Sequence, residues 1–109
     1  MRATLAQSLS VAANVTTANL MNGKLFARLS RRTKLVLAAA AAAAGLNHTL
    51  IVGGKVLIND EAISQANRFP LTPDDISAVE MAGPGEIVYT VRNTTGAAVV
   101  LTGAWIDAA

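Results

Sequence analysis

The stretch that decides the fold is Gly85–Asp107, GEIVYTVRNTTGAAVVLTGAWID. Ile87, Tyr89 and Val91 share one side of a period-two pattern rich in β-branched and aromatic residues, which is typical of a β-strand. Asn93–Gly96 supplies turn residues, because Asn tolerates tight turns and Gly accepts a positive φ. A second alternating set follows, so the stretch predicts a β-hairpin. Because an isolated hairpin is only marginally stable, it also predicts further strands beneath it and an all-β domain.

Two aromatic residues of this stretch, Tyr89 and Trp105, are predicted to anchor the hairpin to a core. The chain has 109 residues, the length of one domain, and only four of them are aromatic. This content is low for a self-sufficient sandwich. We therefore expect part of the stability to come from neighbouring subunits.

The amino-terminal segment differs in composition from the remainder. Residues 1–22 are small and polar and predict an extended arm of low order, with a strand around Ser10 to Thr17. Residues 23–109 are then the predicted β-sandwich domain, with its first strand over Lys24–Ser30.

The run TKLVLAAAAAAA, Thr33–Ala44, supports two predictions. Alanine is the best helix former, so local propensity favours a helix over residues 36–44. Leu35–Leu37 at the start and Gly45 at the end, just before a hairpin, favour a strand. We expect a strand, whose alanine face would let another sheet or subunit approach closely.

The middle of the chain adds a hairpin and a loop. Asn47–Asn59 predicts two strands around a two-residue turn at Gly53–Gly54. Asn67–Ile76 contains two prolines, which exclude a helix and a central strand, and predicts a crossing loop pinned to the core by Phe69 and Leu71. Seven or eight strands in about 100 residues predict a single-domain antiparallel β-sandwich that is jelly-roll-like.

Charge divides the chain into two halves. Residues 1–59 hold seven basic residues and no acidic one, whereas residues 60–109 hold two basic and seven acidic residues. Such halves suit a chain that packs against copies of itself or presents a basic arm to an acidic partner. They are equally suited to neutralise each other inside one fold.

The basic residues concentrate in one run, which is the candidate contact surface. It consists of Lys24, Arg28, Arg31, Arg32 and Lys34. Such a run can bind the phosphates of packaged nucleic acid by neutralising their charge, form a solvated face, or contact another subunit. We favour the subunit contact. The candidate acids on the neighbouring copy are Asp60, Glu61, Asp74 and Asp75.

Catalytic and cofactor sites have little support in this sequence. His48 is the only histidine, and its position at the start of a strand is typical of a rim or partly buried imidazole. The carboxylate pairs at Asp60–Glu61 and Asp74–Asp75 could chelate a hard cation, but such pairs more often mark solvated turns. The longest apolar run, Leu35–Leu46, falls short of the roughly 20 residues of a membrane span. We expect neither enzymatic activity, nor a cofactor, nor a membrane span.

Three sets of turn and loop residues support a resemblance. Asn67–Pro70 followed by Pro73–Asp75, Arg92–Ala97 between two strands, and the Gly-Gly hairpin at Val52–Lys55 resemble small β-sandwich virion proteins of bacteriophages. The resemblance covers roughly residues 20–109. It implies a capsid, minor-capsid or decoration protein, located in the virion and assembled in symmetric copies, without enzymatic activity. Its implied partners are copies of itself and other capsid proteins.

A second class of function is a non-enzymatic binding module, either carbohydrate-binding or adhesin-like. Such sandwiches usually display exposed aromatic residues, and Tyr89 and Trp105 are few for that purpose.

Overall fold

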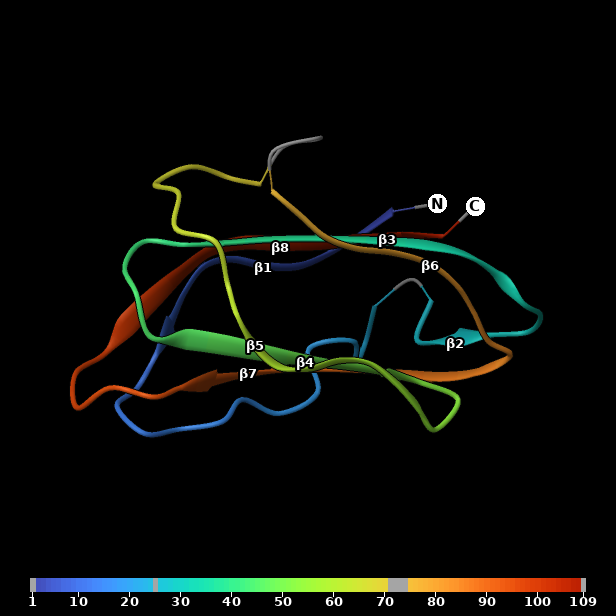
Figure 1. Cartoon of the computed structure of the whole chain (residues 1–109), viewed down its shortest axis with the longest axis horizontal. Coiled ribbons are helices and arrows are strands. Elements are labelled where there is room, and N and C mark those ends of the chain that lie inside the picture. The colour runs from blue at the N-terminus through green and yellow to red at the C-terminus, as the bar shows by residue number, and fades with distance from the viewer. Residues whose placement is uncertain (1, 25, 71–74, 109) are drawn as a thin grey trace.

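The computed structural model describes residues 2–24, 26–70 and 75–108, which form eight strands in two layers (Figure 1). The strands are β1 (Arg2–Val11), β2 (Arg28–Leu29), β3 (Thr33–Ala41), β4 (Leu46–Val52), β5 (Lys55–Ala62), β6 (Ile76–Ala82), β7 (Gly85–Asn93) and β8 (Val99–Ala108). No helix occurs in these residues, and none is therefore available to cross a membrane.

The strand order is that of a jelly roll. One sheet has the order β1-β8-β3-β6, and the sheet facing it has the order β2-β7-β4-β5. Each antiparallel pair encloses the next one along the chain: β1–β8 encloses β2–β7, which encloses β3–β6, which encloses β4–β5. This is the pattern of one long hairpin that is folded over twice. The prediction of an all-β, antiparallel sandwich is confirmed.

The stretch Gly85–Asp107 contains two strands, as predicted, but the prediction that they form a hairpin is wrong. β7 pairs with β2 and β4, whereas β8 pairs with β1 and β3 in the other sheet. The buried side chain of Asn93 lies at this change of sheet. Its Nδ2 donates to the carbonyl oxygens of Val11 and Ala97, and its Oδ1 accepts from the Thr95 amide. These bonds stabilise an arch between the sheets.

The alanine run forms the strand β3 over Thr33–Ala41, so the expected strand is confirmed and the helix alternative is wrong. β3 lies between β8 and β6, and its four alanines, Ala38–Ala41, have no exposed surface. Ala39 and Ala41 belong to the core between the sheets. Ala38 and Ala40, on the opposite face, lie beside Trp105 and Gly103 of β8. Burial on both faces outweighs the helix propensity of alanine, which is less than 1 kcal/mol per residue over most residue types.

The crossing loop covers the outer face of the β1-β8-β3-β6 sheet. A Cβ atom on Gly103 would collide with the ring of Phe69, so the loop packs directly on β8. Trp105 Nε1 donates a hydrogen bond of 2.9 Å to the carbonyl oxygen of Pro70. Phe69 thus pins the loop, although on the outer face of a sheet and not in the core between the sheets. Leu71, the other predicted anchor, lies outside the described residues.

The amino-terminal segment does not begin as an arm. Arg2–Val11 forms β1 along the edge of one sheet, where Ala3, Leu5 and Val11 face the core. The strand expected around Ser10 to Thr17 is therefore misplaced. The strand expected over Lys24–Ser30 shrinks to the two residues of β2. Small side chains on the solvent face of β1 made an edge strand resemble an arm.

The turn at Gly53–Gly54 has the predicted geometry. The two residues have φ angles of 58° and 84° and join the paired strands β4 and β5. Positive φ at both positions is the conformation that favours glycine in a two-residue hairpin turn.

Candidate functional site

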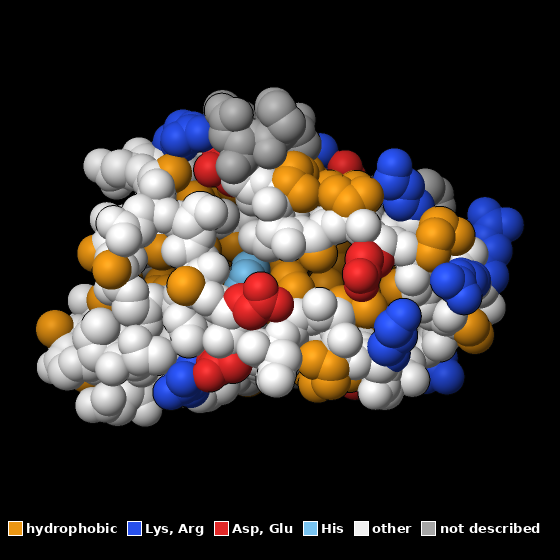
Figure 2. Space-filling view, viewed as in Figure 1, with side chains coloured by type: hydrophobic (Ala, Val, Ile, Leu, Met, Phe, Trp, Pro, Cys, Tyr) orange, Lys and Arg blue, Asp and Glu red, His pale blue; other side chains and the backbone are white. Residues whose placement is uncertain are grey.

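The predicted basic run gathers at one end of the sandwich. Arg28 lies on β2, Arg31 and Arg32 lie in the connection to β3, and Lys34 lies on β3; all four are exposed. Lys55, the first residue of β5, adds another exposed cation. Figure 2 shows Lys and Arg side chains concentrated over one end of the molecule. We call Arg28, Arg31, Arg32 and Lys34 the basic end.

Lys24 lies apart from the basic end. It is half-buried and lines a cavity of about 410 Å³ beside β1. The apolar lining of that cavity comes from Leu5, Leu9 and Leu20. The run predicted from sequence therefore divides into the basic end and a separate lysine.

Arginines elsewhere in the chain are paired with carboxylates of the same chain. The distances between nitrogen and oxygen are 2.8 Å for Arg2–Asp107, 2.6 Å for Arg92–Asp60 and 3.1 Å for Arg68–Asp75. The hydrogen bond from Arg92 lowers the pKa of Asp60, and the one from Arg2 lowers the pKa of Asp107. Asp60 and Asp107 therefore stay ionised at neutral pH.

The basic end differs from these three arginines. Among residues 2–24, 26–70 and 75–108, none of its four cations forms an ion pair. Among these pairs, only Arg2–Asp107 joins the two halves of the chain, because Arg68, Asp75, Arg92 and Asp60 all belong to the second half. The alternative that the two halves neutralise each other thus holds for Arg2. It does not hold for the basic end.

Two of the acids predicted to meet a neighbour are occupied within the chain. Asp60 accepts both hydrogen bonds from Arg92, and Asp75 is buried beside Arg68. Asp74 lies outside the described residues. Glu61 is exposed and carries no ion pair in the described part of the chain, so it alone of the four is shown available to a neighbour. The described residues also hold no group of three His, Cys, Asp or Glu side chains suited to a metal ion.

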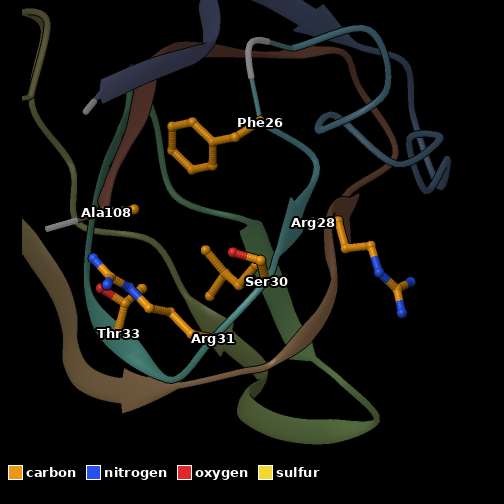
Figure 3. A pocket seen from close by; sticks show the side chains of 7 residues that line it. Phe26, Arg28, Ser30, Arg31, Thr33 and Ala108 are labelled. Carbon is orange, nitrogen blue, oxygen red and sulfur yellow. The ribbon is translucent and has the colours of Figure 1, made fainter.

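A cavity of about 300 Å³ opens beside the basic end. Phe26, Leu29 and Ala108 supply apolar lining, and Ser30, Arg31 and Thr33 supply polar lining. Figure 3 shows the ring of Phe26 at one side of the hollow and Arg28 pointing away from it. The basic end thus combines cations with an apolar depression, a composition that suits a protein contact as well as an anion.

The open side of the sandwich lies between β5 and β6, each of which is the edge strand of its sheet. Of the five large hydrophobic side chains exposed among the described residues, three lie on these strands: Val56, Val79 and Met81. Figure 2 shows hydrophobic side chains in the hollow between the sheets. This surface was not predicted from the sequence, because no strand was expected at Ile76–Ala82, where Val79, Glu80 and Met81 are exposed in succession.

The predicted anchors Tyr89 and Trp105 are both buried, at 0% and 1% exposure. Tyr89 belongs to the core between the sheets, and its hydroxyl lies 2.8 Å from Nδ1 of His48. Trp105 lies on the outer face of its sheet, beneath the crossing loop, with the guanidinium of Arg2 3.9 Å from its ring centre. Neither ring is available to stack on a ligand.

His48 is buried and not at a rim. Burial lowers its pKa to about 4 and raises the pKa of Tyr89, so both side chains are neutral at pH 7. The two rings meet edge to face, with centres 5.6 Å apart. The pair is a satisfied polar contact within the core.

Comparison with family models, curated proteins and solved structures gives no match. The function must be argued from the strand order and from the surfaces described above.

Proposed function

We propose that this chain is a structural subunit that assembles in symmetric copies in a bacteriophage virion, as a capsid, minor-capsid or decoration protein without enzymatic activity. The jelly roll is a fold that viral capsid domains use, and lectins and cupins use it too. Because one fold serves several functions, the surfaces of this chain must distinguish them.

The observation that carries the proposal is that the basic end forms no ion pair within the part of the chain that the structure describes. Carboxylates of the same chain engage Arg2, Arg68 and Arg92, while Arg28, Arg31 and the cations beside them face outward. A surface of this kind fits an acidic neighbour in an assembly. Exposed ion pairs contribute only about 0–1 kcal/mol each, so the charges would orient the subunits while apolar contacts hold them together.

The alternative of a carbohydrate-binding or adhesin-like module has less physical support. Such a module stacks aromatic rings on its ligand, and the rings of Tyr89 and Trp105 are buried. The turn motifs at Asn67–Pro70 and Arg92–Ala97, which resemble those of phage virion proteins, also favour the first function.

Native mass spectrometry and light scattering on the purified protein test the proposal. The expected result is a discrete multimer or particle that forms without nucleic acid. Neutralising the basic end with Arg28→Gln, Arg31→Gln and Arg32→Gln together should weaken that assembly. Arg92→Gln, which removes an exposed cation away from the basic end, is the control and should leave assembly intact.

Two outcomes would contradict parts of this proposal. A protein that stays monomeric at every concentration would contradict assembly itself. If the wild type instead assembles only with an added oligonucleotide, and the triple variant fails only to take it up, the basic end faces packaged nucleic acid and not a neighbouring subunit.

A further inference from the structure

β6 has a free backbone edge. It pairs with β3 on one side, and no strand of the described residues pairs with its other side. The amide of Ala39 on β3 donates to the carbonyl of Asp75, so the odd-numbered residues of β3 direct their backbone groups toward β6. Leu37 and Leu35 lie opposite Ala78 and Glu80.

The backbone of Val79 and Met81 therefore faces away from β3. Alternate residues of a strand direct their N–H and C=O groups to opposite sides, and it is Ala78 and Glu80 that face β3. An unpaired strand edge is a template for another strand, and proteins protect such edges with Lys, Pro or a bulge. β6 has an irregularity near Ser77 at its start and one charged residue, Glu80, but Ala78–Ala82 contains neither Lys nor Pro.

Apolar side chains accompany this free edge. Val79 and Met81 are 50% and 48% exposed on the outer face of the sheet, and Val36 of β3 lies beside Val79. Val56, 51% exposed, lies on β5, the edge of the other sheet on the same side of the molecule. A partner that pairs with β6 would shield both backbone and side chains at this open side.

The sequence of β6 is suited to pair with itself. Val79 is the middle residue of the strand Ile76–Ala82. An antiparallel copy centred there places Val79 opposite Val79 and Ala78 opposite Glu80, so the two glutamates are not directly opposed. Like charges directly opposite each other would be destabilising, and this register avoids them.

We infer that β6 pairs with β6 of a second copy about a two-fold axis at Val79, so that two four-stranded sheets become one sheet of eight strands. The contact is isologous, since the same surface serves both copies. This inference rests on the proposed self-assembly and names one of its contact surfaces.

Single cysteines test the register, because the chain has no cysteine of its own. Val79→Cys should form a disulfide-linked dimer under mild oxidation, since directly opposite residues have Cα atoms about 4.5–5.5 Å apart, within the disulfide range. Met81→Cys is the matched control on the same strand. Its two copies would lie four residues apart along the strands, about 14 Å, and should not cross-link. Val100→Cys, at an exposed position of the central strand β8, should not cross-link either.

A charge variant tests the same contact without cross-linking. Val79→Lys places two like charges opposite each other across the axis, and should weaken dimer formation at least tenfold in light scattering. Val15→Lys, at a similarly exposed valine, should change it less than twofold. Thermal unfolding at high dilution checks that both variants remain folded.

The outcomes separate this inference from the proposed function. A monomeric wild type without cross-linking overturns both. A multimeric wild type in which Val79→Cys does not cross-link, or cross-links no better than Met81→Cys, overturns the β6 contact alone. If Val79→Lys weakens assembly while Val79→Cys fails to cross-link, another segment and not a second β6 covers this edge, which also overturns the inference.

Discussion

The buried His48 makes the stability of this protein depend on pH between 7 and 5. Its side chain is 2% exposed, and burial lowers its pKa from 6.5 to about 4. The unfolded chain therefore binds a proton near pH 6.5, whereas the folded chain does not do so until about pH 4. Within this window the unfolded state holds more protons, so the free energy of unfolding decreases as the pH falls.

The size of the effect follows from the two pKa values of His48. One pKa unit corresponds to about 1.4 kcal/mol, so the full shift amounts to about 3 kcal/mol below pH 4. Between pH 7 and pH 5 the loss is about 2 kcal/mol. Asp60 and Asp107 have lowered pKa values, so their contribution is lost only at lower pH and does not mask the histidine.

Urea unfolding at pH 7, 6 and 5, at one protein concentration, measures this loss. The matched control is His48→Asn, which keeps a polar side chain but does not titrate. We expect the wild type to lose about 2 kcal/mol more than the variant over this range. Equal dependence on pH in the two proteins would refute the reasoning and show that His48 is protonated in the folded state.

Three further substitutions, in two experiments, test the packing. Trp105→Ala should cost about 3–5 kcal/mol in urea unfolding, because the ring is buried beneath the crossing loop and donates to Pro70; an unchanged stability would mean that the loop does not hold the sheet. Gly53→Ala should lower the melting temperature more than Gly54→Ala, since both glycines have positive φ but only a Cβ on Gly53 would collide with the carbonyl oxygen of Pro84. Equal effects would place the close contact elsewhere.

Local patterns predicted strands better than they predicted partners. The alternation from Ile87 to Val91 identified β7 because it reflects a half-buried pleated strand. The same alternation is compatible with a hairpin or with an arch between sheets. The choice depends on the hydrogen bonds of Asn93 to Val11 and Ala97, which are 82 and 4 residues away and become visible only in the folded chain.

The candidate surfaces were also predictable from the sequence only in part. Arg28, Arg31 and Arg32 are close in sequence, so their clustering at one end could be foreseen. The acids could not be assigned, because Asp60 of β5 meets Arg92 of β7 across the intervening strand β4, at a distance of 32 residues in sequence. β6 escaped detection since an edge strand with three exposed residues in succession, from Val79 to Met81, lacks the burial pattern of a central strand.

The alanines of β3 and the free edge of β6 belong to the same sheet, β1-β8-β3-β6, whose outer face is covered only in part. On β3 and β8 the small residues Ala38, Ala40 and Gly103 leave room on this face. The crossing loop packs there and buries Trp105. Toward β6 the same face carries the larger Val79, which the loop leaves half exposed. The chain thus seals one half of this face itself. The other half of the face borders β6, the strand that we infer to pair with a second copy.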